Sequence, residues 1–210
     1  MTIASLRRAI YAGAGSTILP LGFHKTPREQ RYVKQFPEGI QGVLELTDSK
    51  RGQALVVSLG VGFIVSEVEA LLAEWTSNPK VDTYTTFGNV GYLLPGRTWR
   101  DTCFPLGASV EGGLSDIAHL SKDIALPFLD KNASLRGVSD CLEQEILPYA
   151  LRRNMVERLP ILYALRGNEE LASSALAEMQ RSLNAPDAKT PVFRWEAYME
   201  GYRKRFPAVL

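Results

Sequence analysis

The chain has 210 residues, of which 45% are hydrophobic and 22% charged, a composition that excludes wholesale disorder and allows one large or two small packed domains. The formal net charge of +1 gives no basic excess that would favour a nucleic-acid partner. No apolar run approaches the roughly 20 residues of a membrane-spanning helix, so we expect no membrane association. The two cysteines, Cys103 and Cys141, form no CxxC motif. Reduced thiols in a cytoplasmic protein are expected, with one bridge left open.

The first half of the chain predicts a helix followed by an antiparallel sheet. Apolar residues recur at helical spacing between Ile3 and Ile18, and Pro20 ends that helix. Strand-like runs follow at 30–36, 40–47 and 55–64, with turns at 37–39 and 47–52. In the third run Leu55, Val57, Leu59, Val61 and Phe63 face one way. Its other face holds the small residues Ser58, Gly60 and Gly62, which leave room for close approach. A helix or a ligand could use this room, or it could stay unused.

The middle of the chain predicts one helix and several short strands. Ser66 and Glu69 fit a capping box that starts a helix, and Asn78-Pro79 stops it. The expected strands lie at 81–86 and 91–94, around a turn at 87–89, with a further edge strand at 98–104.

After Pro105 the pattern is almost entirely helical. A first helix carries an apolar face and is expected to kink or end at Pro127. Further helices are expected at 134–147, from Pro148 to Arg166, after the Gly167-Asn168 turn, and from Thr190 onward. The predicted fold class is therefore α+β: an N-terminal helix, a small antiparallel sheet, and a helix-rich C-terminal half packed on it. The predicted regions are 1–108, with the sheet, and 109–210, helical, packed as one compact unit.

Few residues point to chemistry. Asp116, His119 and Asp123 share a helix face and could hold a divalent ion with a fourth ligand, although a solvated polar face is the favoured interpretation. Cys103 could act as a nucleophile only if His24 or His119 came near it. The sequence therefore predicts no catalytic set, no metal site and no cofactor.

Two aromatic groups are candidates for an interaction surface. Tyr92, Trp99 and Arg100 lie in a loop-rich segment, and Trp195, Tyr198 and Tyr202 lie on the final helix. Tyr, Trp and Arg dominate interface hot spots. For the final helix, core packing is the competing interpretation.

The runs Ile18–Lys25, Arg31-Tyr32 and Val56–Val61, followed by Ile124–Leu129, resemble a family of uncharacterised bacterial domains with an "LGF" turn and a strand ending in "nLGv". The resemblance covers about the first 130 residues and implies a small cytoplasmic accessory protein. It carries over no catalytic residues. Some bacterial immunity proteins have a similar size and a similar lack of motifs.

The first hypothesis is therefore a non-enzymatic protein-binding module, an immunity or inhibitor type of protein that neutralises a partner toxin. The alternative is an enzyme with a dispersed site around His24, Cys103 or the Asp116/His119/Asp123 face. A homo-oligomeric structural protein is a third hypothesis, because the sequence leaves the oligomeric state open.

Overall fold

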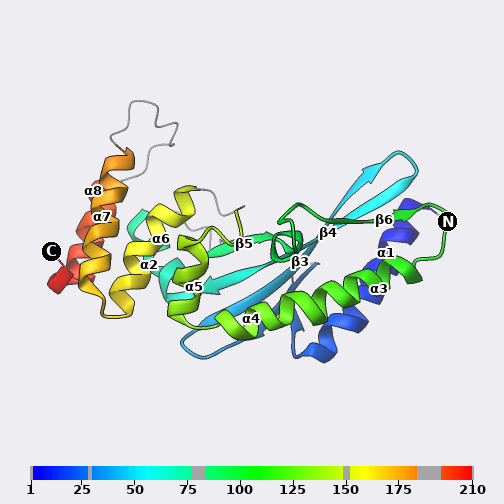
Figure 1. Ribbon diagram of the computed structural model, residues 1–210, viewed down its shortest axis with the longest axis horizontal. Helices are drawn as coiled ribbons and strands as arrows, with labels where there is room; N and C mark the ends of the chain where they lie inside the picture. The colour runs from blue at the N-terminus through cyan, green and yellow to red at the C-terminus, as the bar shows by residue number, and fades with distance from the viewer. Residues whose placement is uncertain (1, 28–29, 77–83, 149–151, 184–194, 210) are drawn as a thin grey trace.

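The computed structural model describes residues 2–27, 30–76, 84–148, 152–183 and 195–209 (Figure 1). Helix α1 (Ile3–Ile18) precedes an antiparallel sheet, and helices make up most of the second half of the chain. This is the α+β class that the sequence predicts. No helix within these ranges is long and apolar enough to cross a membrane.

Helix α1 is fixed at both ends by its own sequence. Thr2 caps its start, and Thr2 and Ser5 satisfy each other's backbone N–H groups. The 3-10 helix η1 (Leu19–Leu21) continues it around Pro20 and ends at Gly22, whose φ of 88° suits glycine. Arg7 and Tyr11 on the exposed side of α1 both donate hydrogen bonds to Asp48.

The sheet has six strands, and all neighbouring strands are antiparallel. They are β1 (His24–Lys25), β2 (Arg31–Gln35), β3 (Ile40–Arg51), β4 (Ala54–Val65), β5 (Thr86–Asn89) and β6 (Asp101–Pro105). Their order is β1-β2-β3-β4-β5, and β6 pairs with the first half of β4. The central β3–β4 hairpin stays in register from Ile40↔Val65 to Arg51↔Ala54.

Three local predictions in the sheet region are wrong. The expected loop at 47–52 is mostly strand, because these polar residues pair with the start of β4 and only Gly52 and Gln53 turn. Gly52 has a φ of 59°, which such a tight turn requires. The expected turn at 87–89 belongs to β5, and the expected strand at 91–94 is largely the 3-10 helix η2 (Val90–Leu93), capped by Asn89. Residues 81–83 lie outside the described residues.

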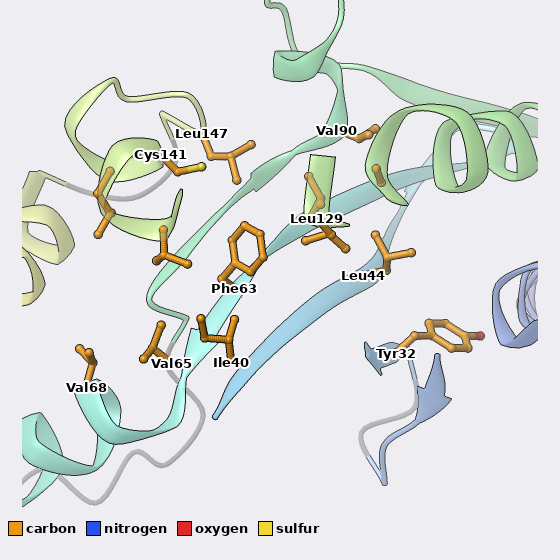
Figure 2. Packing of buried hydrophobic residues seen from close by; sticks show 14 of the residues in the cluster. Tyr32, Ile40, Leu44, Phe63, Val65, Val68, Val90, Leu129, Cys141 and Leu147 are labelled. Carbon is orange, nitrogen blue, oxygen red and sulfur yellow. The ribbon is translucent and has the colours of Figure 1, made fainter. Parts of the chain in front are cut away.

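The first face of the sheet carries the core. Leu55, Val57, Leu59, Val61 and Phe63 are all buried there, as the alternation in the sequence predicts. Helices α1, α3 (Glu111–His119) and α4 (Leu126–Asn132) lie along this face (Figure 1). Figure 2 shows Leu44 and Phe63 of the sheet with Leu129 of α4 packed near them. One cluster of buried hydrophobic residues joins this layer to the helices at the other end of the molecule.

Helices α3 and α4 are joined by a π-helix, η3 (Leu120–Ala125), so the helical path continues to Asn132. The expectation that the helix could end at Pro127 is therefore wrong. Proline lacks an N–H and crowds the preceding turn. Here it occupies the first turn of α4, directly after the wider π-helical turn, where its missing N–H is tolerated.

The remaining helices gather around α2 (Ser66–Thr76) at the other end of the molecule (Figure 1). They are α5 (Leu135–Glu143), α6 (Arg152–Leu165), α7 (Glu169–Leu183) and α8 (Trp195–Arg205), followed by the 3-10 helix η4 (Pro207–Val209). The predicted turn between α6 and α7 is confirmed: Gly167 has a φ of 69°, and Asn168 accepts a hydrogen bond from the Leu171 N–H. The expected helix starts at Pro148 and Thr190 border or enter segments outside the described residues.

Candidate functional site

The second face of the sheet, opposite α1 and α4, carries small and polar residues. Because side chains alternate along a strand, the register assigns Arg31, Glu45, Gly60 and Asn89 to one row across four strands. The next row contains Thr47, Ser58 and Asp101. The sheet thus gathers residues from distant parts of the sequence on one surface.

An aromatic ring from β5 lies against the glycines of β4. A Cβ added to Gly60 would lie 2.1 Å from Cζ of Phe87, so only glycine leaves room for this ring. The Tyr84 ring stacks on Phe87 with a centroid distance of 4.1 Å and an interplanar angle of 16°. The close approach that Gly60 and Gly62 allow is therefore made by an aromatic side chain of the protein itself.

A buried cation completes this stack. The guanidinium of Arg31 lies 4.6 Å from the Tyr84 ring centroid, and its Nε donates to Glu45 at 2.9 Å. Burial disfavours the charge on Arg31, but the hydrogen bonds and electrostatic interactions with Glu45 and Tyr84 together outweigh it, and the pKa of Arg31 is raised. Burial, and then the hydrogen bond to Glu45, raise the pKa of Tyr84, so its hydroxyl stays a neutral donor. This group is a preorganised Arg–Tyr–Glu unit on the second face.

Trp99 lies beside this unit and is 49% exposed. Its Nε1 donates to Asp101 at 2.7 Å, and the Tyr92 ring meets it edge-on at a centroid distance of 6.5 Å. Asp101 also accepts a hydrogen bond from the Ser58 hydroxyl. The indole is therefore held in one orientation while about half of its surface faces solvent.

Asn89 fixes the loop that carries Trp99. Its Oδ1 accepts hydrogen bonds from the N–H groups of Gly91 and Arg100, each at 2.9 Å, and its Nδ2 donates to the Arg100 carbonyl at 2.9 Å. A Cβ at Gly91 would lie 2.2 Å from the Thr98 carbonyl oxygen, so this close chain crossing requires glycine. The position of Trp99 is thus set by backbone contacts as well as by its own hydrogen bond.

Two hollows lie on the second face. The smaller has a volume of about 130 Å³ and is lined by Glu45, Thr47, Ser58, Gly60, Phe87, Gly88, Asn89 and Trp99. The larger has a volume of about 620 Å³ and is lined by Thr26, Pro27, Arg31, Val33, Gln41, Ile64, Ser66, Glu69, Ala70 and Ala73. The Arg31–Glu45 ion pair connects them, because Arg31 lines the larger hollow and Glu45 the smaller.

The structure separates the residues predicted to form an interaction surface. Tyr92 and Trp99 lie together, whereas the Arg100 guanidinium bonds Asp116 of α3 at 2.6 Å. Tyr198 and Tyr202 are completely buried, so an exposed role for them is wrong.

Those two tyrosines are buried because the rest of the core fits them. Trp75 meets both rings edge-on, at centroid distances of 5.3 Å and 5.9 Å, and their hydroxyls donate to backbone carbonyls of α6. Trp195 is partly buried and lies beside Tyr198 with parallel rings at 6.3 Å. The final helix therefore packs into the core, as the competing interpretation of its aromatic pattern expects.

The pairings considered for cysteine chemistry do not form. His24 on β1 and Cys103 on β6 are both exposed, and three strands lie between them, which alone separates them by about 19 Å. His119 lies on α3, which contacts β6 through a 2.7 Å hydrogen bond between Thr102 and Asp116. Because adjacent strand residues point to opposite faces, Cys103 points away from α3.

The side chains of Asp116, His119 and Asp123 also do not come together in one cluster. Asp116 bonds Arg100 and Thr102, while His119 Nδ1 lies 2.8 Å from Asp123 Oδ2. The π-helix η3 begins directly after His119 and changes the spacing on which the shared face depended. In the part of the chain that the structure describes, no group of three or more His, Cys, Asp or Glu residues could hold a metal ion.

Sequence reasoning found Trp99 but missed Arg31, Glu45, Tyr84 and Phe87 as members of one site. The signal that pointed toward them was the run of small residues on the second face of β4. That run indicated a close approach and did not identify the approaching group.

A scan against protein-family models, a search of curated proteins and a search of solved structures found no match to this chain. The chemistry of the second face therefore remains the guide to function.

Proposed function

We propose that this protein is a non-enzymatic protein-binding module of the bacterial immunity or inhibitor type, which neutralises a partner toxin in the cytoplasm. The observation that carries the proposal is Trp99, a tryptophan half exposed on the second face yet held by a hydrogen bond at 2.7 Å. Tryptophan is among the residues that contribute most to protein–protein binding.

The surroundings of Trp99 favour binding to a preformed surface. An interface side chain that is already ordered loses less conformational entropy when the partner arrives. The Asp101 carboxylate, the Tyr92 ring and the loop contacts of Asn89 provide that order before binding. We therefore expect the partner to contact Trp99 without rearrangement of the sheet.

The immunity type rests on the size of the chain, on its resemblance to uncharacterised bacterial domains and on a ready contact surface. The net charge of +1 gives no long-range attraction to a basic toxin. Recognition is therefore expected to depend on close contacts at the second face, and raising the salt concentration should reduce the affinity only modestly.

The test is affinity capture from cells of the native organism, with three immobilised versions of the chain. Wild type and Leu171→Ala should each recover the same stoichiometric protein, whereas Trp99→Ala should lose it. Leu171 is a matched control because it is an exposed apolar residue, 41% accessible, on the distant helix α7. A hot-spot loss of about 2 kcal/mol or more corresponds to an affinity reduction of about 30-fold.

Circular dichroism should show that both variants keep the wild-type fold. Failure to recover any protein, or equal recovery by Trp99→Ala, would remove the proposal. The immunity role has its own test: the recovered protein should inhibit growth when expressed alone, and co-expression of the wild-type chain should restore growth. If the recovered protein is harmless, the chain is a binding module of another kind.

A further inference from the structure

We propose that the smaller hollow beside Trp99 receives the guanidinium group of an arginine side chain from the protein partner. This inference rests on the proposed function and specifies the chemistry of the contact. It follows from the hydrogen-bonding groups that line the hollow, from its shape, and from an arrangement that the second face already contains.

The polar part of the lining is rich in hydrogen-bond acceptors. Glu45 contributes a carboxylate, and Thr47 and Ser58 contribute hydroxyls. The Ser58 hydroxyl hydrogen is directed to Asp101, so its oxygen presents lone pairs to the hollow. One Asn89 amide hydrogen is already donated to the Arg100 carbonyl, which reduces the competing donors. A ligand rich in donors fits such a lining, and guanidinium carries five N–H donors and no acceptor.

The shape of the hollow fits a flat group. Trp99 and Phe87 provide aromatic walls, and Gly60 and Gly88 add no side chain. The volume of about 130 Å³ is well below the several hundred Å³ of sites that bind drug-sized molecules, and it suits the end of a single side chain. Arginine stacks on aromatic faces, whereas lysine is a compact, strongly hydrated point charge.

Charge near the hollow also favours a cation. Asp101 lies opposite Ser58 in the strand register and accepts hydrogen bonds from Ser58 and Trp99, two residues that line the hollow. A cationic neighbour of Asp101 is Arg51, at 3.6 Å, whose side chain is 68% exposed and therefore largely screened by solvent. The charge of Glu45 is already paired with Arg31, so the attraction for an incoming guanidinium comes chiefly from the nearby, weakly compensated Asp101.

The protein already uses the same chemistry next to the hollow. Arg31 lies over the Tyr84 ring and donates to Glu45, the carboxylate that also lines the hollow. A partner arginine against Trp99 would reproduce this Arg–aromatic–carboxylate arrangement on the other side of Glu45.

The test is a titration followed by nuclear magnetic resonance of the intact chain. Its three tryptophans give three indole N–H signals, and Trp99→Phe identifies that of Trp99. N-acetyl-arginine amide, added into the millimolar range, should shift the Trp99 signal saturably. N-acetyl-citrulline amide has the same shape without the charge, and we expect it to bind at least tenfold more weakly. Equal shifts with the two probes, or none, would overturn the inference.

Two variants establish that the response comes from the hollow. Thr47→Val keeps the shape of an exposed side chain but removes one acceptor, and we expect it to weaken N-acetyl-arginine amide binding several-fold. Asp130→Asn removes a surface carboxylate that pairs with Lys34 and should leave binding unchanged. Equal weakening by both variants would show that the response is not specific to the hollow and would contradict the inference.

A second arm separates this inference from the proposed function. The captured partner is treated either with phenylglyoxal, which modifies arginines, or with an acetylating reagent, which modifies lysines. Only the arginine treatment should prevent recapture. If the phenylglyoxal-treated partner still binds through Trp99, the proposed function stands and the arginine inference fails. If no partner is captured, the proposed function fails, and the titration still decides whether the hollow binds guanidinium.

Discussion

The buried ion pair between Glu69 on α2 and Arg158 on α6 provides a quantitative test of how the helices are joined to the sheet. Arg158 donates two hydrogen bonds to the carboxylate, at 2.8 Å and 2.7 Å, and Thr85 donates a third at 2.8 Å. The side chain of Arg158 is only 4% exposed and that of Glu69 only 8%. Thr85 in turn accepts a hydrogen bond from the Val65 N–H, which links the pair to β4.

Removal of one partner leaves the other charge buried, at a cost of about 3–5 kcal/mol. The loss of stability caused by Glu69→Leu should lie near the upper end of this range. Arg158 would then keep only a longer acidic contact, 3.9 Å to Glu157. Arg158→Met should fall near the lower end, because Glu69 lines the larger hollow, where water can reach its carboxylate. The double variant replaces both charges with apolar side chains and should remain within about 1 kcal/mol of the wild type.

The assay is urea unfolding of the four proteins, followed by circular dichroism, with the free energies compared in a double-mutant cycle. The account predicts two strongly destabilised single variants and a double variant that recovers most of the loss. If each single change cost less than about 1 kcal/mol, or if the two losses simply added, the buried pair would not connect the helices to the sheet as described.

Three further predictions concern other parts of the structure. Gly60→Ala should cost about 1–3 kcal/mol in urea unfolding because its Cβ would clash with Phe87, and the loss should largely disappear in a Phe87→Ala background; an undiminished loss would contradict this. Burial raises the pKa of Asp48, but the hydrogen bonds from α1 outweigh it and hold that pKa below its usual value. The stabilisation by ionised Asp48 is fully present above the unfolded pKa of about 3.9 and is lost as pH falls through the folded pKa. Asp48→Asn should therefore flatten the fall in melting temperature between pH 5 and pH 2. An unchanged profile would refute this prediction. Burial raises the pKa of Cys141 to about 12, so a thiol reagent at pH 8 should modify exposed Cys103 quickly and Cys141 only after unfolding; two fast thiols would contradict the buried position.

The fold could be predicted wherever one periodic pattern extended over a whole element. The alternation from Leu55 to Phe63 predicted both the strand and its buried face, since that face packs against helices. The Gly167-Asn168 turn was equally clear because each residue acts locally, one through its φ and one through a cap. These features depend on a few neighbouring residues, so the sequence contains nearly all of the information.

Predictions failed where distant pairing decides the conformation. Residues 87–89 contain Gly and Asn and indicate a turn, yet their pairing with Gly60, Val61 and Gly62 of β4 makes them a strand. The polar end of β3 indicates a loop, yet its partners across the hairpin hold it in the ladder. Local composition could not reveal these partners.

The candidate site shows the same division. Trp99 was predicted because an aromatic residue in a loop-rich segment is a local signal. Arg31, Glu45 and Tyr84 come from β2, β3 and the segment before β5, and only the strand register brings them together. The final helix shows the reverse error. Its Tyr, Trp and Arg content indicated a surface, but the fit between Trp75 and Gly201 buries its tyrosines, since a Cβ at Gly201 would lie 2.2 Å from the Trp75 ring.

The most direct test of the central claim is photo-crosslinking in living cells from a benzoylphenylalanine placed at position 103, which keeps Trp99 in place. Cys103 is exposed on β6, on the second face and two residues from Asp101. The same crosslinker at position 171, on the distant helix α7, is the control. Binding through the second face predicts one discrete protein adduct from position 103 and none from position 171. No adduct from position 103, or the same adducts from both positions, would contradict the proposal that Trp99 marks the binding surface of this protein.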